Sequence, residues 1–159
     1  MDVKSRHHLR SDAVREIREA LAEGLGVDLD ADSFEKVDLE DEDWEVVLVD
    51  GSPLVLYLSG EPFLTVRGAN EYPPARRRVT VDAGAIQFVS DGADVMRPGV
   101  VEADPDIAEG DLVVVDEEAH GKVLAVGRAL TGGEDMVGDR GRVVESLHRV
   151  GDGLYELTV

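Results

Sequence analysis

Apolar residues recur at helical spacing near the start of the chain. They lie three or four positions apart, which gives a helix one apolar face. They are Val14, Ile17, Leu21 and Leu25. Ser11 or Asp12 is suited to cap the start of this helix, and glycines at 24 and 26 mark its end. The pattern therefore predicts one amphipathic helix over 11–25.

The residues that follow are typical of short β-strands. Four runs are rich in leucine, β-branched and aromatic residues, and the last three are separated by the turns DGS and SGE. The runs are FEKVDL from Phe34, WEVVLVD from Trp44, PLVLYLS from Pro53 and PFLTVR from Pro62. A helix followed by several strands predicts a small α+β domain.

A proline-rich segment, NEYPPARRR, follows these strands. Pro73 and Pro74 favour extended backbone and prevent a helix from running through Ala75. We therefore place a domain boundary here, which divides the chain into residues 1–75 and 76–159.

The second part also alternates between strand patterns and turns. RVTVD, DLVVVD and KVLAVGRAL are typical of strands, AGAIQFVS of a short helix, and GADVMRPG of a loop that enters a strand. GGEDMVG indicates a helical turn. The runs GRVVESLHRV and GLYELTV indicate a hairpin that turns at Gly151, Asp152 and Gly153. The pattern predicts a small, mostly β barrel, so the whole chain is assigned to the α+β class.

The chain is strongly acidic. Its 159 residues carry 35 acidic and 16 basic side chains, a formal net charge of −19. Such a surface is typical of a protein that mimics nucleic acid or docks to basic proteins. It is also typical of a protein adapted to molar salt, where ions screen the repulsion between acidic side chains. The acids are dispersed, and their longest run is EDED at Glu40 to Asp43. Because interaction tails usually carry longer blocks of like charge, we favour the halophilic interpretation.

Other features limit where the protein acts. The chain has no cysteine, which excludes disulfides and thiolate metal sites. It contains no apolar run of about 18 residues, the length that a membrane span needs, and its first ten residues lack the apolar core of a signal peptide. We expect a cytoplasmic protein that does not contact membranes.

No residue pattern indicates catalysis. The histidines do not have the spacing of metal ligands: His7 and His8 are expected in a frayed terminus, His120 in a turn and His148 in a strand. The chain has no phosphate-binding loop with a lysine. We therefore expect no catalytic residue, no metal and no cofactor.

Two segments are candidates for binding. The triplet Arg76, Arg77 and Arg78 could contact phosphates or pair with nearby acids such as Glu71 and Asp82, and the sequence leaves both open. In GADVMRPG, small residues would let a phosphate or base approach the backbone, and an arginine would add a donor. The alternative is a tight turn from helix to strand.

Several motifs resemble those of one RNA-binding module. VDAGAIQFVSDGADVMRPGV, EGDLVVVDE, KVLAVGRAL and GRVVESLHRVGDGLYEL occur in the order and spacing of a PUA domain, over residues 78–157. DAGAIQFVSDGADVMRPG and GDGLYEL are similar, more narrowly, to the malignant T-cell amplified sequence family and its archaeal relatives. Those proteins carry a small N-terminal domain before the PUA domain, as expected for residues 1–75.

The resemblance implies a pseudo-barrel that binds RNA through its glycine-rich loop and a neighbouring strand. Carried over by position, the RNA-binding residues are Gly92, Ala93, Asp94, Val95, Met96, Arg97, Pro98, Gly99, Gly127 and Arg128. The resemblance implies a non-catalytic protein of translation whose ligand is the tRNA acceptor end or small-subunit rRNA, acting in initiation, re-initiation or recycling. It also implies a separate partner similar to the density-regulated protein.

Two alternatives stay open. PUA domains often accompany RNA-modifying enzymes, so the chain could be the RNA-binding subunit of a tRNA or rRNA modification system. It could also be an adaptor on the ribosome that uses its acidic surface to bind basic proteins.

Overall fold

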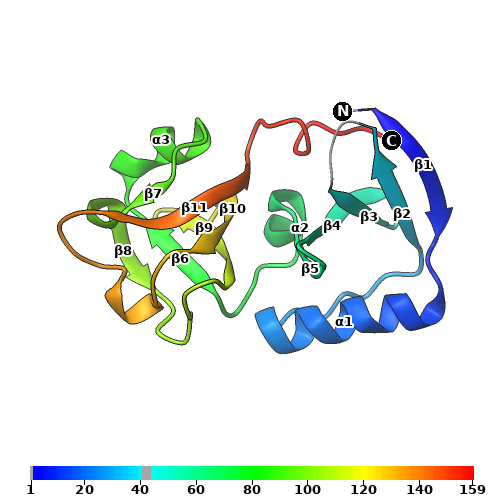
Figure 1. Cartoon of the computed structure of the whole chain (residues 1–159), viewed down its shortest axis with the longest axis horizontal. Coiled ribbons are helices and arrows are strands. Elements are labelled where there is room, and N and C mark those ends of the chain that lie inside the picture. Colours follow the sequence, from blue (N-terminus) through cyan, green and yellow to red (C-terminus); the bar gives the residue numbers. More distant parts are fainter. Residues whose placement is uncertain (1, 41–43) are drawn as a thin grey trace.

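Two β-sheets, one from each half of the chain, organise the protein (Figure 1). The structure is a computed structural model, and it describes residues 2–40 and 44–159. The first sheet is an antiparallel meander in the order β1-β2-β3-β4-β5. Its strands are β1 (Val3–His8), β2 (Phe34–Leu39), β3 (Glu45–Val49), β4 (Ser52–Leu58) and β5 (Glu61–Leu64).

Helix α1 (Ser11–Leu25) packs on this sheet and has the predicted bounds. It buries Ile17, Leu21 and Leu25, which is the apolar face that the spacing indicates. Gly26 ends the helix in the left-handed conformation, with φ at 68°. The predicted cap at the start is wrong: Arg10 occupies the N-cap position, and no side chain caps the helix there.

Strand β1 corrects the expectation of a frayed start. Its residues are all exposed, so no apolar alternation reveals the strand in the sequence. Backbone pairing with β2 holds it, and two side-chain contacts add to this pairing: Ser5 donates to Asp38 at 2.7 Å, and Arg6 pairs with Glu35. The histidine pair at its end, His7 and His8, is therefore part of a sheet edge.

Helix α2 (Val66–Glu71) is a second correction, since PFLTVR was expected to be one strand. The strand stops at Leu64 because Thr65 caps a helix: its Oγ1 accepts a hydrogen bond from the backbone N–H of Gly68 at 3.0 Å. The helix ends before the two prolines, as their chemistry requires. Figure 1 shows α2 between the two sheets.

The second sheet has the order β7-β11-β10-β9-β6-β8, with only β6 and β9 parallel. Its strands are β6 (Arg78–Val81), β7 (Val95–Met96), β8 (Val100–Ala103), β9 (Leu112–Glu117), β10 (Val123–Ala129) and β11 (Arg142–Arg149). The short helical elements are η1 (Ala83–Ala85), α3 (Ile86–Ser90), η2 (Arg97–Gly99) and η3 (Gly133–Asp135). Because η2 joins the edge strands β7 and β8, the sheet nearly closes into a barrel. The predicted fold class is confirmed.

Strand β9 faces two cores. Leu112 and Val114 pack with the first sheet and α1, whereas Val113 and Val115 fill the barrel. This explains an apolar run without polar alternation, because both faces of the strand are buried. The two halves thus share an apolar interface. The expected boundary at Ala75 falls between the two sheets, and the division into two domains stays a prediction.

The C-terminal segment is a third correction, because it turns instead of forming the expected hairpin. Asp152 accepts hydrogen bonds from the backbone N–H groups of Arg149 and Tyr155, both at 2.9 Å, and so fixes a tight turn after β11. Leu154 and Leu157 then insert into the core of the first half. The end of the chain therefore ties the second half back onto the first.

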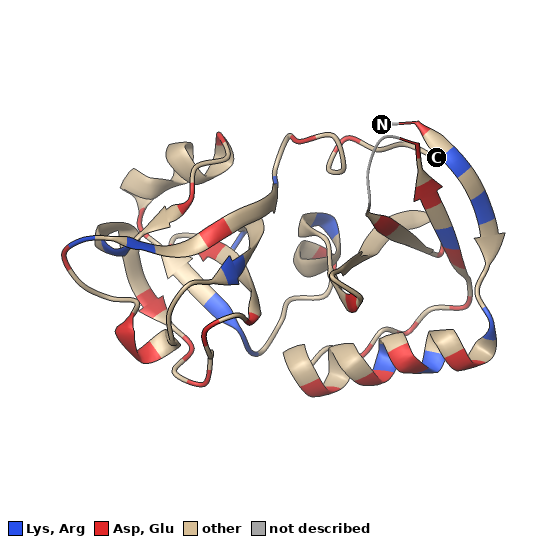
Figure 2. Ribbon diagram, viewed as in Figure 1, with Lys and Arg blue, Asp and Glu red and all other residues tan. Residues whose placement is uncertain are grey.

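Acidic side chains are spread over both halves (Figure 2). Of the acidic run that starts at Glu40, the residues 41–43 lie outside the described part of the chain. Within that part, no helix is long and apolar enough to cross a membrane.

Candidate nucleic-acid interface

An apolar hollow lies at the end of the barrel that carries the glycine-rich loop. Its volume is about 400 Å³, within the range of small-molecule sites. Residues from η1, α3, β7 and η2 line it: Gly84, Ala85, Phe88, Val89, Ala93, Val95, Met96, Pro98 and Gly99, with Asp82 and Asp94 as its acidic members. The hollow therefore contains most of the predicted loop residues.

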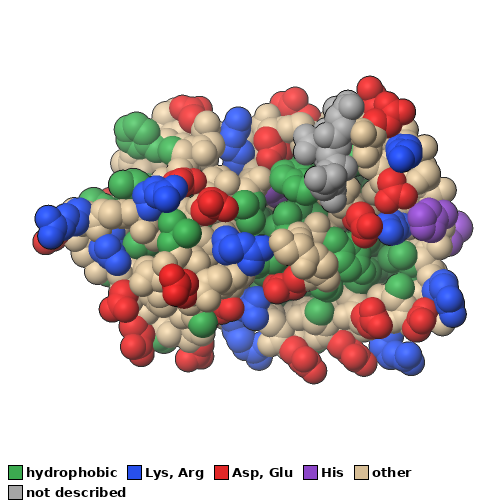
Figure 3. Space-filling model, viewed as in Figure 1, with side chains coloured by type: hydrophobic (Ala, Val, Ile, Leu, Met, Phe, Trp, Pro, Cys, Tyr) green, Lys and Arg blue, Asp and Glu red, His purple; other side chains and the backbone are tan. Residues whose placement is uncertain are grey.

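Two large apolar side chains of this hollow are exposed to solvent. Phe88 is 68% exposed and Met96 is 48% exposed, in a protein that buries most residues of these types. Figure 3 shows hydrophobic side chains on the surface at the end of the molecule where α3 lies. An exposed aromatic ring beside an apolar hollow is suited to stack on a flat, uncharged group.

Asp94 fixes the loop to β11. Its Oδ1 accepts from the backbone N–H of Ser146 at 2.9 Å, and its Oδ2 accepts from Arg142 at 2.7 Å. The hydrogen bond from Ser146 holds the pKa of Asp94 below its usual value, against the effect of burial, and Arg142 adds to this lowering. Asp94 thus orients Arg142, whose side chain is 57% exposed.

The lowered pKa predicts how an Asp94→Asn variant responds to pH. A depressed folded-state pKa adds stability above the unfolded value, about 3.9, and this stability is lost as the pH falls through the folded-state pKa. We expect Asp94→Asn to be less stable than wild type at neutral pH, and the difference to shrink below about pH 4. Urea unfolding over this range measures it, with the exposed Asp139→Asn as control. A difference that stays constant with pH would contradict the assignment.

Arg97 belongs to the predicted loop but has a structural role. Its Nε donates to the carbonyl of Asp135 at 2.8 Å, and a terminal nitrogen donates to the carbonyl of Arg140 at 2.7 Å. It packs so closely on Gly138 and Gly141 that a Cβ at either position would crowd it. Arg97 therefore holds the loop before β11, and it does not line the hollow.

The glycines of the loop also serve packing. Gly92 has φ at 97°, and a Cβ there would lie 2.6 Å from the side chain of Arg149, which itself donates to the carbonyl of Ser90. A Cβ on Gly99 would lie 3.0 Å from that of Ala85. Gly92 and Gly99 thus allow the loop to pack closely on its neighbours, and the hollow results from this close packing.

The two predicted residues on β10 lie outside the hollow. Gly127 sits at a register shift with β11, where a Cβ would overlap the carbonyl of Glu145. Arg128 donates to the carbonyl of Gly110 at 2.8 Å. It lines a different hollow, of about 550 Å³, beside Trp44 of the first half.

Two arginines of the basic triplet connect the two halves of the chain, and the third pairs within the second half. Arg76 donates to the carbonyl of Glu23 at 2.8 Å near the end of α1, and Arg77 pairs with Glu61 at 3.4 Å. Arg78 pairs with the buried carboxylate of Asp116. All three guanidinium groups thus have acceptors within the protein, and none of these acceptors is Glu71 or Asp82.

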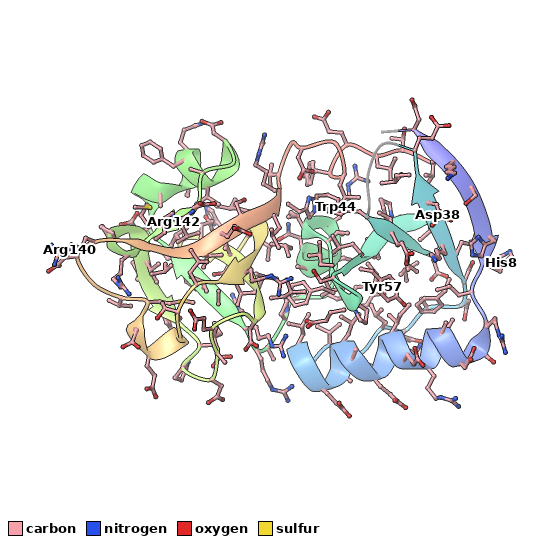
Figure 4. The ribbon with its side chains drawn as sticks, viewed as in Figure 1. His8, Asp38, Trp44, Tyr57, Arg140 and Arg142 are labelled. Atoms are coloured by element: carbon pink, nitrogen blue, oxygen red, sulfur yellow. The ribbon has the colours of Figure 1, made fainter. Side chains whose placement is uncertain are left out.

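The sequence pattern did not assign Phe88 or Arg142 to the site. AGAIQFVS contains an aromatic residue in an amphipathic run, which normally points inward. Arg140 lies in the loop before β11, and Arg142 is the first residue of that strand. Only the pairing of β7 with β11 brings Arg142 opposite Met96. Figure 4 shows Arg140 at the tip of the molecule.

His148 is held in a structural network. It is 1% exposed, its Nε2 accepts from the backbone N–H of Val66 at 3.1 Å, and its Nδ1 lies 2.8 Å from Asp152. Since both ring nitrogens have partners, the His148–Asp152 pair joins β11 to α2. Among the described residues, no three His, Cys, Asp or Glu side chains gather in a way that would hold a metal ion.

Comparison with known sequences agrees with these features. The family profile of the PUA domain matches residues 77–151. An uncharacterized protein of Methanocaldococcus jannaschii is 35% identical over 98% of both chains. Translation machinery-associated protein 20 of Saccharomyces cerevisiae is 32% identical over 70% of this chain, and malignant T-cell-amplified sequence 2 of Homo sapiens is 31% identical over 71%. The aligned region spans 65% of the length of each of these two eukaryotic proteins.

Comparison with solved structures extends the similarity to nearly the whole chain. A hypothetical protein from Pyrococcus horikoshii has a TM-score of 0.85 and 31% identity, and the match covers 98% of this chain and 100% of that one. A conserved PUA domain protein from Thermoplasma acidophilum has a TM-score of 0.82 and 28% identity, covering 95% and 97%. The chain therefore belongs to the PUA-domain proteins, and it is homologous to the family of malignant T-cell-amplified sequence and translation machinery-associated proteins.

Proposed function

We propose that the protein is a non-catalytic RNA-binding factor of the translation machinery, and that its apolar hollow takes an unpaired base at the end of an RNA. The hollow with the exposed ring of Phe88 supports this proposal most strongly. Aromatic rings commonly bind unpaired RNA bases by stacking. The names of the eukaryotic relatives support the connection to translation.

The chemistry of the hollow favours a base over a phosphate. Its charged members are the carboxylates of Asp82 and Asp94, which repel phosphate but are able to accept hydrogen bonds from the amino groups of bases. Arg142 adjoins the hollow, because it pairs with the lining residue Asp94. We infer that the base enters the hollow and that Arg142 contacts the phosphate next to it.

The RNA in this proposal is the acceptor end of deacylated tRNA, with small-subunit rRNA as the other candidate. An acceptor end offers unpaired terminal bases, which a hollow of this size admits. The protein would act in the cytoplasm, in initiation, re-initiation or recycling, together with a separate partner similar to the density-regulated protein.

The proposal includes an adaptation to high salt. Figure 3 shows acidic side chains scattered over the visible face and not gathered in one patch. Molar salt screens their mutual repulsion. At such salt, the release of counterions adds little to affinity, so stacking and shape must contribute most of it. Binding experiments therefore require high potassium chloride.

Removing the ring of Phe88 is expected to weaken RNA binding about 5- to 150-fold, because stacking on one base contributes about 1–3 kcal/mol. Since Phe88 is 68% exposed, Phe88→Ser should leave the fold intact. Val137→Ser is the matched control, because Val137 is also exposed, at 59%, and does not line the hollow. Fluorescence anisotropy with labelled deacylated tRNA measures the dissociation constants.

The same experiment with tRNA trimmed of its CCA end separates the possible ligands. We expect trimming to weaken binding to wild type and to have no further effect on Phe88→Ser. If trimming is without effect while small ribosomal subunits bind through Phe88, rRNA is the ligand. If Phe88→Ser binds tRNA and subunits as wild type does, the proposed site is wrong, and an acidic adaptor becomes the better interpretation.

A further inference from the structure

Basic residues are concentrated at the start of this acidic chain. Five of the seven lysines and arginines among residues 1–75 occur in the first 18 residues, which contain only three acids. They lie on β1, at Arg10 before α1 and on the first half of α1, at the opposite end of the long axis from α3 (Figure 1). This basic end is therefore far from the hollow that contains Phe88.

A hollow of about 520 Å³ opens at this end, where β1 turns into α1. Its polar lining comes from His8, Arg15, Arg18, Ser11, Ser33 and Asp32. It thus has two arginines and a histidine against one acid, whereas acids outnumber lysines and arginines in the whole chain. Figure 4 shows His8 at the end of β1, beside the start of α1.

Arg18 forms a fixed wall of this hollow. It donates to the carbonyl of Ala31 at 2.7 Å, and its guanidinium lies over the ring of Phe34, 5.3 Å from the centroid. In contrast, Arg15 is exposed, and neither it nor His8 forms an ion pair within the described part of the chain. The hollow therefore combines a positioned cation with one that is available to a ligand.

We propose that this basic hollow binds a backbone phosphate of the RNA whose terminal base enters the hollow at Phe88, an inference that rests on the proposed function. Arginine and serine side chains are common donors to phosphate oxygens. The carboxylate of Asp32 opposes an anion, so the phosphate lies on the side of Arg15 and His8.

The surroundings fit a chain of phosphates better than a single small anion. The exposed side chains of Lys4 and His7 continue along β1, which is the open edge of the first sheet. Figure 3 shows histidine side chains at this end of the molecule, with basic side chains on either side of them. The ammonium of Lys4 and the imidazole of His7 lie outside the hollow and offer donors to further phosphates of a polyanion, whereas a single small ion in the hollow gains nothing from them.

The two sites give the protein a selectivity for RNA length. A short RNA fills only the hollow at Phe88, whereas an RNA that reaches along the molecule also contacts the basic hollow. A folded tRNA or a ribosomal RNA helix meets this requirement.

The test compares Arg15→Gln with Lys122→Gln, which removes the same charge from the exposed turn between β9 and β10. Full-length deacylated tRNA and a short single strand ending in CCA are the two probes. We expect Arg15→Gln to weaken tRNA binding about three- to fivefold. We also expect it to lower the salt slope, which is the fall in the logarithm of the binding constant per unit increase in the logarithm of the salt concentration, by about 0.7 to 0.9. The short strand should bind unchanged, and Arg15→Lys should restore the slope.

Three results would overturn the inference. One is that Arg15→Gln binds tRNA with the same affinity and the same salt slope as wild type. Another is an equal loss for Lys122→Gln, which would indicate a general charge effect. The third is that inorganic phosphate displaces tRNA when it is added at the same concentration as the phosphate groups of that tRNA, which would indicate a site for a free ion. Failure of the proposed function is separate, since it appears as unchanged binding of the short strand to Phe88→Ser.

Discussion

His148→Leu is expected to destabilise the protein by about 3 to 5 kcal/mol, because it leaves two polar groups in the interface without their partner. The backbone N–H of Val66 would lose its acceptor in a buried position. The carboxylate of Asp152 would lose the imidazole, and the ring of Trp44 would lose its edge-to-face contact, at 6.2 Å between centroids. Chemical denaturation measures the loss.

The surface variant His7→Leu is the matched control, since His7 lies on exposed β1 and should change stability by no more than about 0.5 kcal/mol. His148→Gln should be intermediate, because its amide oxygen is able to accept from Val66. If His148→Leu were as stable as His7→Leu, the network would not hold the two halves together.

Acid should weaken the same junction. Burial alone would raise the pKa of Asp152, but hydrogen bonds from His148 and from the backbone of Tyr155 and Arg149 hold it below its usual value. Such a group adds stability above its unfolded pKa, and this stability is lost as the pH falls through the folded one.

The second large effect is expected at Gly68. Alanine in place of glycine normally stabilises a helix by about 1 kcal/mol. In α2, however, a Cβ on Gly68 would overlap the carbonyl oxygen of Leu54, which accepts the backbone N–H of Thr65 at 3.0 Å and so has a fixed position. We therefore expect Gly68→Ala to destabilise the protein by about 3 kcal/mol or more.

Gly24→Ala is the control for this substitution, because Gly24 is also helical. The nearest atom to a Cβ there is the end of the Arg77 side chain, at 3.8 Å. We expect Gly24→Ala to raise the melting temperature and Gly68→Ala to lower it. Two changes of the same sign would contradict the packing of α2 against β4.

The periodic elements were predictable from sequence, and the elements defined by long-range contacts were not. Helix α1 has an apolar face that repeats along its length and glycines that mark its end, so the helix could be predicted from local sequence. Helix α2 is short, and it forms because Thr65 caps it and Gly68 fits against β4, a contact that no local pattern reveals. The hydrogen bonds of the turn at Asp152 are local, but no hairpin follows because Leu154 and Leu157 insert into the core of the first half, which no local pattern reveals.

In the candidate site, too, local sequence indicated some features and only tertiary contacts revealed the others. The segment GADVMRPG was identified by its small residues, and it does border the hollow. The partners of its arginine, Asp135 and Arg140, lie some forty residues later in the chain, and Phe88 gains its exposure from the packing of α3. Residue type thus indicated the place, whereas the roles of Arg97 and Phe88 required the tertiary structure.

NMR of the methionine methyl groups tests the central claim, that RNA enters the hollow at Phe88, most directly. Met96 lines the hollow and is 48% exposed, whereas Met136 is completely buried and serves as an internal reference. With a short single-stranded RNA ending in CCA, at high potassium chloride, we predict that the Met96 signal shifts and the Met136 signal does not. A Met96 signal that stays unchanged at saturating RNA would contradict the account.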